Sequence, residues 1–470
     1  MDAVLLSRIQ FAFTIAFHFL FVPLSLGSVV ALVIGERRYY KSGSPQDEAD
    51  ARFWVRLFTA TFAIGVATGI TMEFAFGTNW ATYSRFVGDI FGAPLAAEGL
   101  LSFFLESTFL GVLLFGRERV SRRFYYVSAW LVAIGAHLSA LWIIIANSWQ
   151  QTPAGYEVVD GRAVLTDFFA AALNPSTLPR FFHTVAATWT VGAFFAAGIG
   201  AYYLRKGRHT DFARRMLRFG LVFGLVTSLA MPLLGHWSAV QVADTQPAKM
   251  AAFEGIYTTQ DRAPLSLVGW VDTEAETVTG LALPSGLSIM LGFSPNHVVT
   301  GLDQFAPEDR PPVQLTFQTY HLMVALGLLM IAWMLVGVFL WRRGRLETSR
   351  RYLAVTTWSF LAPMLAIQVG WAAAEVGRQP WIVYNELRTV DAISAVVPAS
   401  QIAISLAIFA VIYTFLFVAW VRVLLRIVRK GPGGPSGGPG HEQPVPAAAV
   451  AAGSVAAATA TRADSTTTTL

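Results

Sequence analysis

The sequence predicts an all-α integral membrane protein: a bundle of about nine transmembrane helices with a long outer loop and a disordered C-terminal tail. Three observations predict this fold. Hydrophobic residues make up 54% of the 470 residues and charged residues 13%, about half the charged fraction of a soluble protein. Several apolar runs are about 20 residues or longer, enough to span a hydrocarbon core. Along the chain, connections rich in Lys and Arg also alternate with connections that contain few of them.

The apolar runs define nine candidate spans within one membrane domain, residues 1–430. The first run is too long for the core of a signal peptide, and no small-residue cleavage site follows it, so we expect it to remain as a helix. The spans are expected at 11–34, 52–76, 93–116, 125–147, 181–204, 217–240, 315–341, 355–377 and 400–427.

The distribution of Lys and Arg predicts the orientation. The segments that follow spans one, three, five, seven and nine hold 24 basic residues, and the opposite segments hold nine. Because cytoplasmic loops carry the excess of Lys and Arg, the N-terminus should be outside and the C-terminus in the cytoplasm. The basic residues lie beside the spans, so the net charge of +5 does not indicate a nucleic-acid partner.

Two segments are expected outside the membrane. Residues 241–314 form an outer loop that is too long to be a simple connector. Residues 431–470 consist of Gly, Pro, Ala and Thr repeats with almost no charge. Such a segment cannot bury a core, so we expect a disordered cytoplasmic tail without chemistry of its own.

The chain contains no cysteine, which excludes disulfides, thiolate zinc sites and protein-bound iron–sulfur clusters within it. Any metal must therefore be held by His, Met or carboxylate side chains. Of the eight histidines, His137 has no evident partner in the sequence. The loop, span-edge and tail histidines are expected to have no metal role; these are His209, His236, His297 and His441.

Six side chains of types that can bind a metal lie inside spans, where a polar group is costly and therefore a functional candidate. They are His18, Glu98, His183, His321, Met323 and Glu375. From the span directions, all should lie roughly 3–12 Å below the outer surface. His, Met and carboxylates in one layer suggest metal or haem ligation, and His with Met is an axial pair of low-spin haem. Taken alone, each polar side chain could instead form a hydrogen bond between helices, and the methionine could simply pack in the apolar core.

Span three carries a second pattern. Glu98, Ser102 and Glu106 are spaced i, i+4, i+8, so we expect neighbours one helical turn apart. Glu106 should lie about 12 Å deeper than Glu98. Ser139 on span four lies at a depth that could extend the row. Such a descent is typical of a proton relay, although interhelical hydrogen bonding would use the same residues.

Five segments carry a family resemblance. They are RIQFAFTIAFHFLFVPLSLG (8–27), EGLLSFFLESTFLGVLLFG (98–116), SALWIIIANSWQQTPAG (139–155), QPAKMAAFEG (246–255) and GWAAAEVGRQPW (370–381). The last segment is the most specific of them. Together the five segments resemble subunit I of cytochrome bd-type ubiquinol or menaquinol oxidases, over roughly residues 1–430.

The resemblance implies three haems: a low-spin haem b, a high-spin haem b, and a haem d or a further haem b in its place. His18 corresponds to the ligand of one high-spin haem. Glu375 corresponds to the ligand of the other, with Glu98 close to that site. His183 and Met323 correspond to the axial ligands of the low-spin haem. Two residues of the GRQPW signature are expected beside a haem; they are Arg378 and Trp381.

The resemblance also implies an activity: quinol oxidation at the outer face, and O2 reduction to water at a di-haem site with cytoplasmic protons. A proton gradient would then form without pumping. Lys249 and Glu254 correspond to the quinol-site residues, and Glu106, Ser139 and Glu98 to the proton path. The implied setting is the bacterial cell membrane, with subunit II as the partner in a heterodimer and a small single-helix subunit as a further candidate.

Two features depart from the better-known members of this family. His321 stands two residues before Met323, where those members have Arg, so haem potential or propionate pairing should differ. The outer loop also lacks the long insertion that some members carry. Neither departure removes a proposed ligand.

Two other functions remain open on the sequence alone. A helical transporter could bind cations with the same carboxylates, and it would contain no chromophore. A b-type electron-transfer subunit would need only His183 and Met323, and it would leave His18, Glu98 and Glu375 without a role. A reduced-minus-oxidised spectrum separates the three.

Overall fold

The computed structural model describes residues 2–433, and within this range the all-α membrane prediction is confirmed. Nine helical segments are long and apolar enough to cross a membrane. Several begin earlier than the apolar runs indicated; the third, for example, begins at Ala81 rather than at 93. The segments are Ala3–Ser42, Pro45–Thr78, Ala81–Phe115, Arg122–Gln151, Thr177–Lys206, Thr210–Thr245, Pro307–Arg342, Arg350–Val376 and Ala399–Lys430.

Polar caps set where several of these helices begin. The Ser44 hydroxyl accepts a hydrogen bond from Asp47 N, and Pro45 occupies the first turn of α3. Ser121 caps α6 in the same way, as is common at helix N-termini. The helices of eight or more residues are α1 Ala3–His18, α2 Val22–Ser42, α3 Pro45–Thr78, α4 Ala81–Ala97, α5 Phe104–Phe115, α6 Arg122–Gln151, α8 Thr177–Lys206, α9 Thr210–Thr245, α10 Pro247–Glu254, α12 Val313–Arg342, α14 Leu361–Val376 and α15 Ala399–Lys430.

Shorter elements complete the described chain. Each strand pair forms a two-stranded antiparallel hairpin. The strands are β1 Tyr156–Val159, β2 Arg162–Leu165, β3 Leu265–Asp272, β4 Thr277–Leu283, β5 Trp381–Val383 and β6 Leu387–Arg388. The short helices are the π-helix η1 Glu98–Phe103, the α-helices α7 Phe168–Ala172, α11 Gly286–Gly292 and α13 Arg350–Thr356, and the 3-10 helices η2 Leu302–Gln304, η3 Pro307–Asp309 and η4 Thr389–Asp391.

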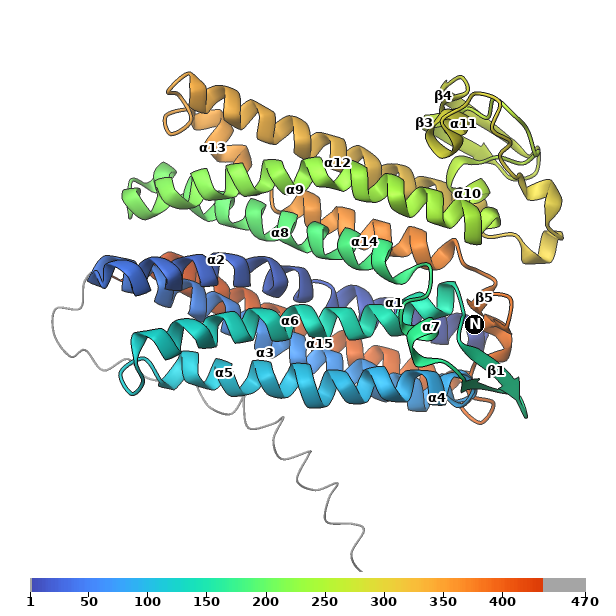
Figure 1. Ribbon diagram of the computed structural model, residues 1–470, viewed down its shortest axis with the longest axis horizontal. Helices are drawn as coiled ribbons and strands as arrows, with labels where there is room; N and C mark the ends of the chain where they lie inside the picture. The colour runs from blue at the N-terminus through green and yellow to red at the C-terminus, as the bar shows by residue number, and fades with distance from the viewer. Residues whose placement is uncertain (1, 434–470) are drawn as a thin grey trace, which may run out of the picture.

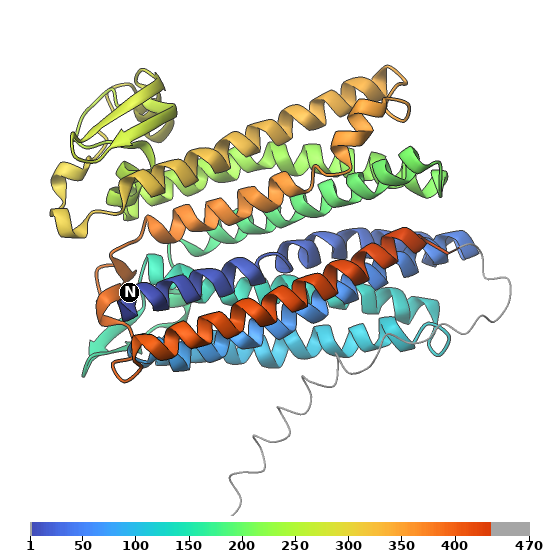
Figure 2. The same ribbon diagram turned by 180° about the vertical axis from the view of Figure 1, so that it is seen from behind.

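The long helices form two layers (Figures 1 and 2). One contains α8, α9, α12 and α14, and the other contains α1 to α6 and α15. The layers meet where α2 crosses α8, at Gly27 and Gly192. A Cβ atom on Gly27 would lie 2.5 Å from Gly192 N, so the two backbones touch here and any larger side chain would force them apart.

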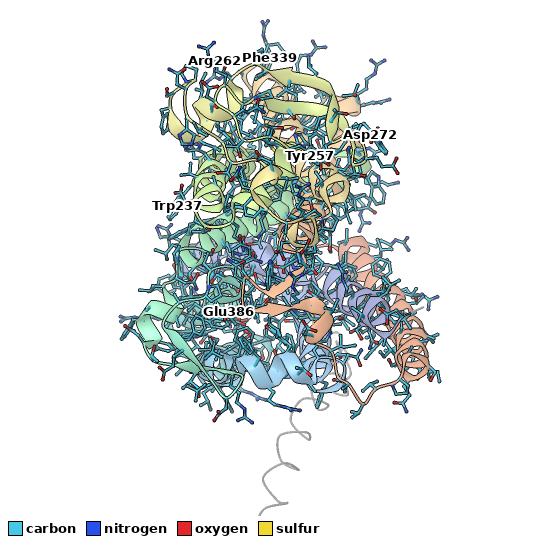
Figure 3. All side chains as sticks on the ribbon, turned by 90° about the vertical axis from the view of Figure 1, so that its right-hand side faces the viewer. Trp237, Tyr257, Arg262, Asp272, Phe339 and Glu386 are labelled. Atoms are coloured by element: carbon cyan, nitrogen blue, oxygen red, sulfur yellow. The ribbon has the colours of Figure 1, made fainter. Side chains whose placement is uncertain are left out.

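The N-terminus, the hairpins and α10 lie at one end of the bundle, at the right of Figure 1. Figure 3 looks onto this end and shows Arg262 and Asp272, in the 241–314 segment, at the upper part of the molecule, with Glu386 below them. This segment, predicted as a loop, contains α10, the β3–β4 hairpin and α11. All but three residues of the predicted tail 431–470, including His441, lie outside the described part of the chain.

Candidate functional site

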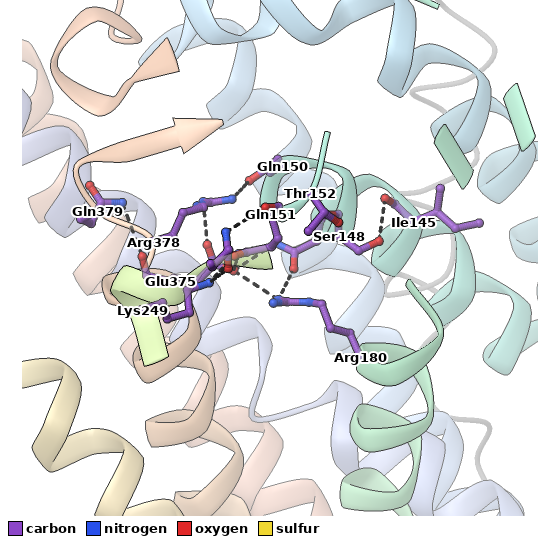
Figure 4. Close-up of polar contacts among 12 residues, drawn as sticks. Ile145, Ser148, Gln150, Gln151, Thr152, Arg180, Lys249, Glu375, Arg378 and Gln379 are labelled. Carbon is purple, nitrogen blue, oxygen red and sulfur yellow. Dashed lines mark hydrogen bonds and ion pairs between the residues drawn. The ribbon is translucent and has the colours of Figure 1, made fainter. Parts of the chain in front are cut away.

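A buried cluster of charged side chains surrounds Glu375 at the end of α14 (Figure 4). Arg378 Nη2 lies 2.6 Å from Glu375 Oε2, and Arg180 Nη2 lies 3.5 Å from Glu375 Oε1. Arg378 is 6% exposed, and its Nη1 also donates to Gln150 Oε1 at 2.5 Å. The GRQPW segment therefore places its arginine beside the carboxylate three residues before it.

Amide side chains connect this cluster to α6 and to α10. Asn147 Nδ2 and Gln151 Nε2 donate to Glu375 Oε1 at 3.2 and 3.3 Å. Lys249 Nζ donates to Gln151 Oε1 and to Gln246 Oε1. Lys249, from the segment expected to bind quinol, is thus one amide away from Glu375.

The cluster carries more positive than negative charge. Lys249 is 2% exposed, and burial, with help from nearby Arg180 and Arg378, lowers the pKa of its ammonium well below the usual range. Even with Lys249 neutral, two guanidiniums face the single carboxylate of Glu375. A buried charge without a counter-ion is costly, so the site suits an added anionic group such as a carboxylate.

Sequence reasoning missed Arg180, Asn147 and Gln151. Arg180 lies at the start of α8, one turn before His183, and an arginine inside a span is itself a functional signal. The two amides lie in the ANSWQQ stretch that helped to carry the family resemblance. Their roles became visible only through their hydrogen bonds to Glu375.

His18 ends α1 and has one ring nitrogen fixed. Its Nδ1 lies 2.9 Å from Thr68 Oγ1 on α3, and the Thr68 hydroxyl is itself within bonding distance of Ile64 O and Gly65 O. His18 therefore donates from Nδ1, which leaves Nε2 as the nitrogen suited to a metal. Fixing one nitrogen in this way is how ligating histidines are oriented.

His183 and Met323 lie on α8 and α12. His183 Nδ1 is buried and has no hydrogen-bond partner within residues 2–433. Met323 Sδ lies only 2.6 Å from where a Cβ atom on Gly370 would be, so the glycine makes room for the thioether. An orphaned imidazole nitrogen and a cradled thioether fit the proposed axial pair.

Glu98 and Ser139 are in direct contact, since Ser139 Oγ donates to Glu98 Oε1 at 2.7 Å. Glu106 is 4% exposed and packs on α6 at Gly135, where an added Cβ would lie 2.6 Å from Glu106 Cγ. The expected regular turn between Glu98 and Ser102 is wrong, because residues 98–103 form a π-helix. Such turns are rare and are frequent at functional sites.

The expectation of one shared depth is wrong for Glu98 and Glu375. On α6, Glu375 contacts Asn147 and Glu98 contacts Ser139, eight residues or about 12 Å apart along the axis. The error arises because the third helix begins at Ala81, so Glu98 lies deeper than the apolar run alone suggested.

Glu254 ends α10 and is 1% exposed. Its Oε2 accepts a hydrogen bond from Ser266 N at 3.0 Å and lies 4.0 Å from His321 Nε2. Its Oε1 is buried without a donor in the part of the chain that the structure describes. Burial raises the pKa of this carboxyl to about 8. The unused acceptor and the raised pKa suit a proton-accepting group.

The structure shows contacts for two further residues named in the sequence analysis. His137 has partners after all: its Nδ1 lies 2.7 Å from Ala133 O, and its Nε2 accepts from Trp189 Nε1 at 3.0 Å. Trp381 begins β5 and stacks under Arg388, whose guanidinium carbon lies 4.8 Å from the ring centre.

No group of three or more His, Asp or Glu side chains suited to a metal ion occurs within residues 2–433. Axial ligation of a haem iron needs only one or two such side chains.

Comparison with known proteins gives one consistent result. A family model described as cytochrome bd terminal oxidase subunit I matches residues 6–432. The chain is 38% identical to cytochrome bd ubiquinol oxidase subunit 1 of Bacillus subtilis (strain 168), over 92% of this chain and 94% of that one. It is 36% identical to cytochrome bd-II ubiquinol oxidase subunit 1 of Escherichia coli (strain K12), over 92% and 97%.

A solved structure supports the same assignment. The bd oxidase structure from Geobacillus thermodenitrificans matches with a TM-score of 0.84 and 30% identity, over 92% of this chain and 99% of that chain. The resemblance found in the sequence is thereby confirmed. The chain belongs to the cytochrome bd terminal oxidase subunit I family, whose members are haem-containing quinol:oxygen oxidoreductases of bacterial respiratory chains.

Proposed function

We propose that this chain oxidises quinol at the outer membrane face and reduces O2 to water at a di-haem site with protons from the cytoplasm. A proton gradient then forms without pumping. The observation that carries the proposal is the Glu375 cluster. It joins a proposed haem ligand to Lys249 through Gln151, so the quinol segment and the oxygen-reducing centre share one buried network.

The described residues fit haem at three places. His18 would hold one high-spin haem and Glu375 the other, with Glu98 close to this pair, while His183 and Met323 would hold a low-spin haem b. Bound haems would supply electron transfer and the metal that takes O2. The high-spin pair would be a haem b with a haem d, or with a further haem b.

The positive charges near Glu375 would compensate the propionates of these haems. Arg378 and Arg180 leave at least one buried positive charge uncompensated, as described above. Trp381 begins the hairpin that follows Arg378 and would cover the haem on the side of that arginine. His321 contacts Ser266 and Phe317 rather than this cluster, so it would not replace the arginine of other members at a propionate.

Glu254 would accept a proton from quinol through its unpaired Oε1. Because Glu254 is 1% exposed, quinol reaches it only after α10 or β3 moves. Lys249 would act from the opposite side of α10, holding that helix against the Glu375 cluster. Ubiquinol and menaquinol both remain candidates for the substrate.

Glu106, Ser139 and Glu98 would carry protons toward the oxygen-reducing centre. Glu106 packs on α6 one turn before Ser139, on the side away from α10 and Glu375. Ser139 already donates a hydrogen bond to Glu98. Ser102, which lies between Glu98 and Glu106 in the sequence, is buried, and its hydroxyl is unpaired among the described residues. A hydroxyl that both donates and accepts can pass a proton between carboxylates.

The chain would sit in the bacterial cell membrane, with its N-terminus outside and its C-terminus in the cytoplasm. The alternation of basic connections supports this orientation. Subunit II would be its partner in a membrane heterodimer, and a small single-helix subunit is a further candidate.

A reduced-minus-oxidised spectrum of the purified complex tests this function. We expect bands of a low-spin haem b and of high-spin haem, and a chlorin-type band only if haem d is present. A spectrum without any haem band would favour the transporter alternative. A low-spin band alone, without CO or O2 binding, would favour an electron-transfer subunit.

Glu254→Gln is expected to slow quinol oxidation about 100-fold or more, the range of a lost general base, while all haem bands remain. In the unaltered enzyme, the rate should rise as the pH increases through about 8, because the pKa of Glu254 lies at about 8 and only the ionised carboxylate accepts a proton. The variant should lose this rise. Initial rates with a quinol analogue across this pH range provide the measurement.

Glu274→Gln is the matched control, because this exposed carboxylate lies in the same outer segment. It should retain both the rate and the pH profile. Unchanged quinol oxidation in Glu254→Gln would remove Glu254 from the quinol site, and haem loss would give the segment a structural role instead.

A further inference from the structure

A hollow of about 60 Å³ opens between α2, α3 and α9, at the basic end of the bundle and away from the Glu375 cluster. Arg38, Asp47, Asp50 and Arg215 provide its polar lining. Its apolar lining includes Ile34, Met216 and Phe219, and Trp54 adds an indole ring with a polar Nε1. We refer to this hollow as the α2–α3–α9 pocket.

Polarity changes with depth along each helix that forms the pocket. On α2, Ile34 lies one turn, or about 6 Å, further into the bundle than Arg38. On α9, Phe219 lies one turn further in than Arg215. The pocket therefore has a charged rim and an apolar floor, the same order in which a phospholipid presents its headgroup and its acyl chains.

The carboxylate acceptors at the rim already have donors. Asp47 accepts from Ser42 Oγ at 2.6 Å and lies 3.5 Å from Arg38 Nε. Asp50 accepts from Gln46 Nε2 at 2.9 Å and from Arg215 Nη2. Two carboxylates thus balance two guanidiniums, and these acceptors need no further partner.

Two donors of the lining are unsatisfied. Trp54 is 1% exposed, and its Nε1 is buried with no acceptor anywhere in residues 2–433. Arg215 Nε is buried and unpaired in the same stretch of structure. Buried donors are nearly always paired in native proteins, so this pocket lacks an acceptor rather than a donor.

We propose that the α2–α3–α9 pocket binds the phosphodiester headgroup of a membrane phospholipid. Phosphate oxygens accept hydrogen bonds and would pair Trp54 Nε1 and Arg215 Nε. Free phosphate offers the same oxygens but would leave the apolar floor uncovered, whereas an acyl chain covers it. Because the rim charges balance, a net anionic headgroup is not required, and zwitterionic phosphatidylethanolamine fits.

Such a lipid would join the two helix layers. Trp54 belongs to α3 in one layer and Arg215 to α9 in the other (Figure 1), and the ion pair of Arg215 with Asp50 already crosses this junction. A phosphodiester bonded to both donors would add a second crossing, so the bound lipid should stabilise the packing of the layers.

Trp54→Phe and Arg215→Lys test the proposal in the purified oxidase complex. The first keeps an aromatic ring and removes the indole N–H, and the second keeps the charge opposite Asp50 and removes Nε. Matched controls are Trp130→Phe, whose exposed Nε1 donates to Tyr126, and Arg214→Lys, whose side chain pairs with Glu347. Native mass spectrometry counts retained phospholipid, and titration of delipidated complex with phosphatidylethanolamine gives an apparent Kd.

We expect the unaltered complex and both controls to retain one more phospholipid than the double variant Trp54→Phe/Arg215→Lys. Each single variant should raise the apparent Kd about tenfold, the loss expected for one hydrogen bond to a charged group. Millimolar inorganic phosphate should not displace the lipid. An unchanged haem spectrum in each variant shows that the complex has folded, and Trp54→Phe alone suffices if the double variant does not fold.

Two results would overturn the proposal. Equal lipid retention and equal Kd in the test and control variants would mean that water, not lipid, pairs the two donors. Displacement of the lipid by inorganic phosphate, dependent on Trp54 and Arg215, would assign the pocket to a soluble phosphate compound instead.

Discussion

His183→Ala is expected to remove the low-spin haem band completely and to lower quinol oxidation to background. His183 Nδ1 is buried without a partner in the described chain, a position that a structural histidine rarely tolerates. Met323→Leu should have the same spectral effect, because leucine keeps the apolar volume beside Gly370 but has no thioether to bind iron. Reduced-minus-oxidised spectra, normalised to total iron, provide the measurement.

His137→Ala is the matched control inside the membrane. Both of its ring nitrogens are hydrogen-bonded to the protein, so its loss should leave all haem bands in place. CO should still bind the high-spin site in the His183 and Met323 variants. Normal low-spin spectra in both variants would disprove this pairing of ligands.

The fold could be predicted from the sequence because each span is a long apolar run. The helix boundaries could not, since hydropathy detects the apolar stretch rather than the helix. Arg85 and Asp89 interrupt the run on the third span, which hides the helix start at Ala81 and moved the expected depth of Glu98 outward. The π-helix that starts at Glu98 also leaves no periodic signal in the sequence.

The proposed site could be predicted in part. The polar side chains stood out because a membrane span makes each of them costly. Their partners could not be inferred, because Glu375 and Asn147 lie 228 positions apart and meet only through packing. Lys249 illustrates the difference: the family resemblance indicated only a quinol-site role, whereas the structure buries its side chain against Gln151 and Gln246.

Glu106→Gln is expected to keep the haem spectrum and the quinol affinity but to slow O2 consumption about 100-fold or more, as for a lost proton-transfer group. Gln preserves the size and hydrogen bonding of the side chain, and it cannot exchange a carboxyl proton. Because Glu106 packs closely on Gly135, the isosteric change avoids a cavity or a clash. Steady-state O2 consumption per haem is the measured quantity.

Normalising to haem separates proton transfer from stability. A purely structural role for Glu106 predicts poor haem retention or a lower melting temperature, with normal turnover of the enzyme that remains assembled. Glu118→Gln is the matched control, since this carboxylate lies just beyond the same helix with its side chain 90% exposed; it should change neither quantity. Full turnover per haem in Glu106→Gln would remove Glu106 from the proton path. Protons would then have to reach Ser139 and Glu98 through other residues.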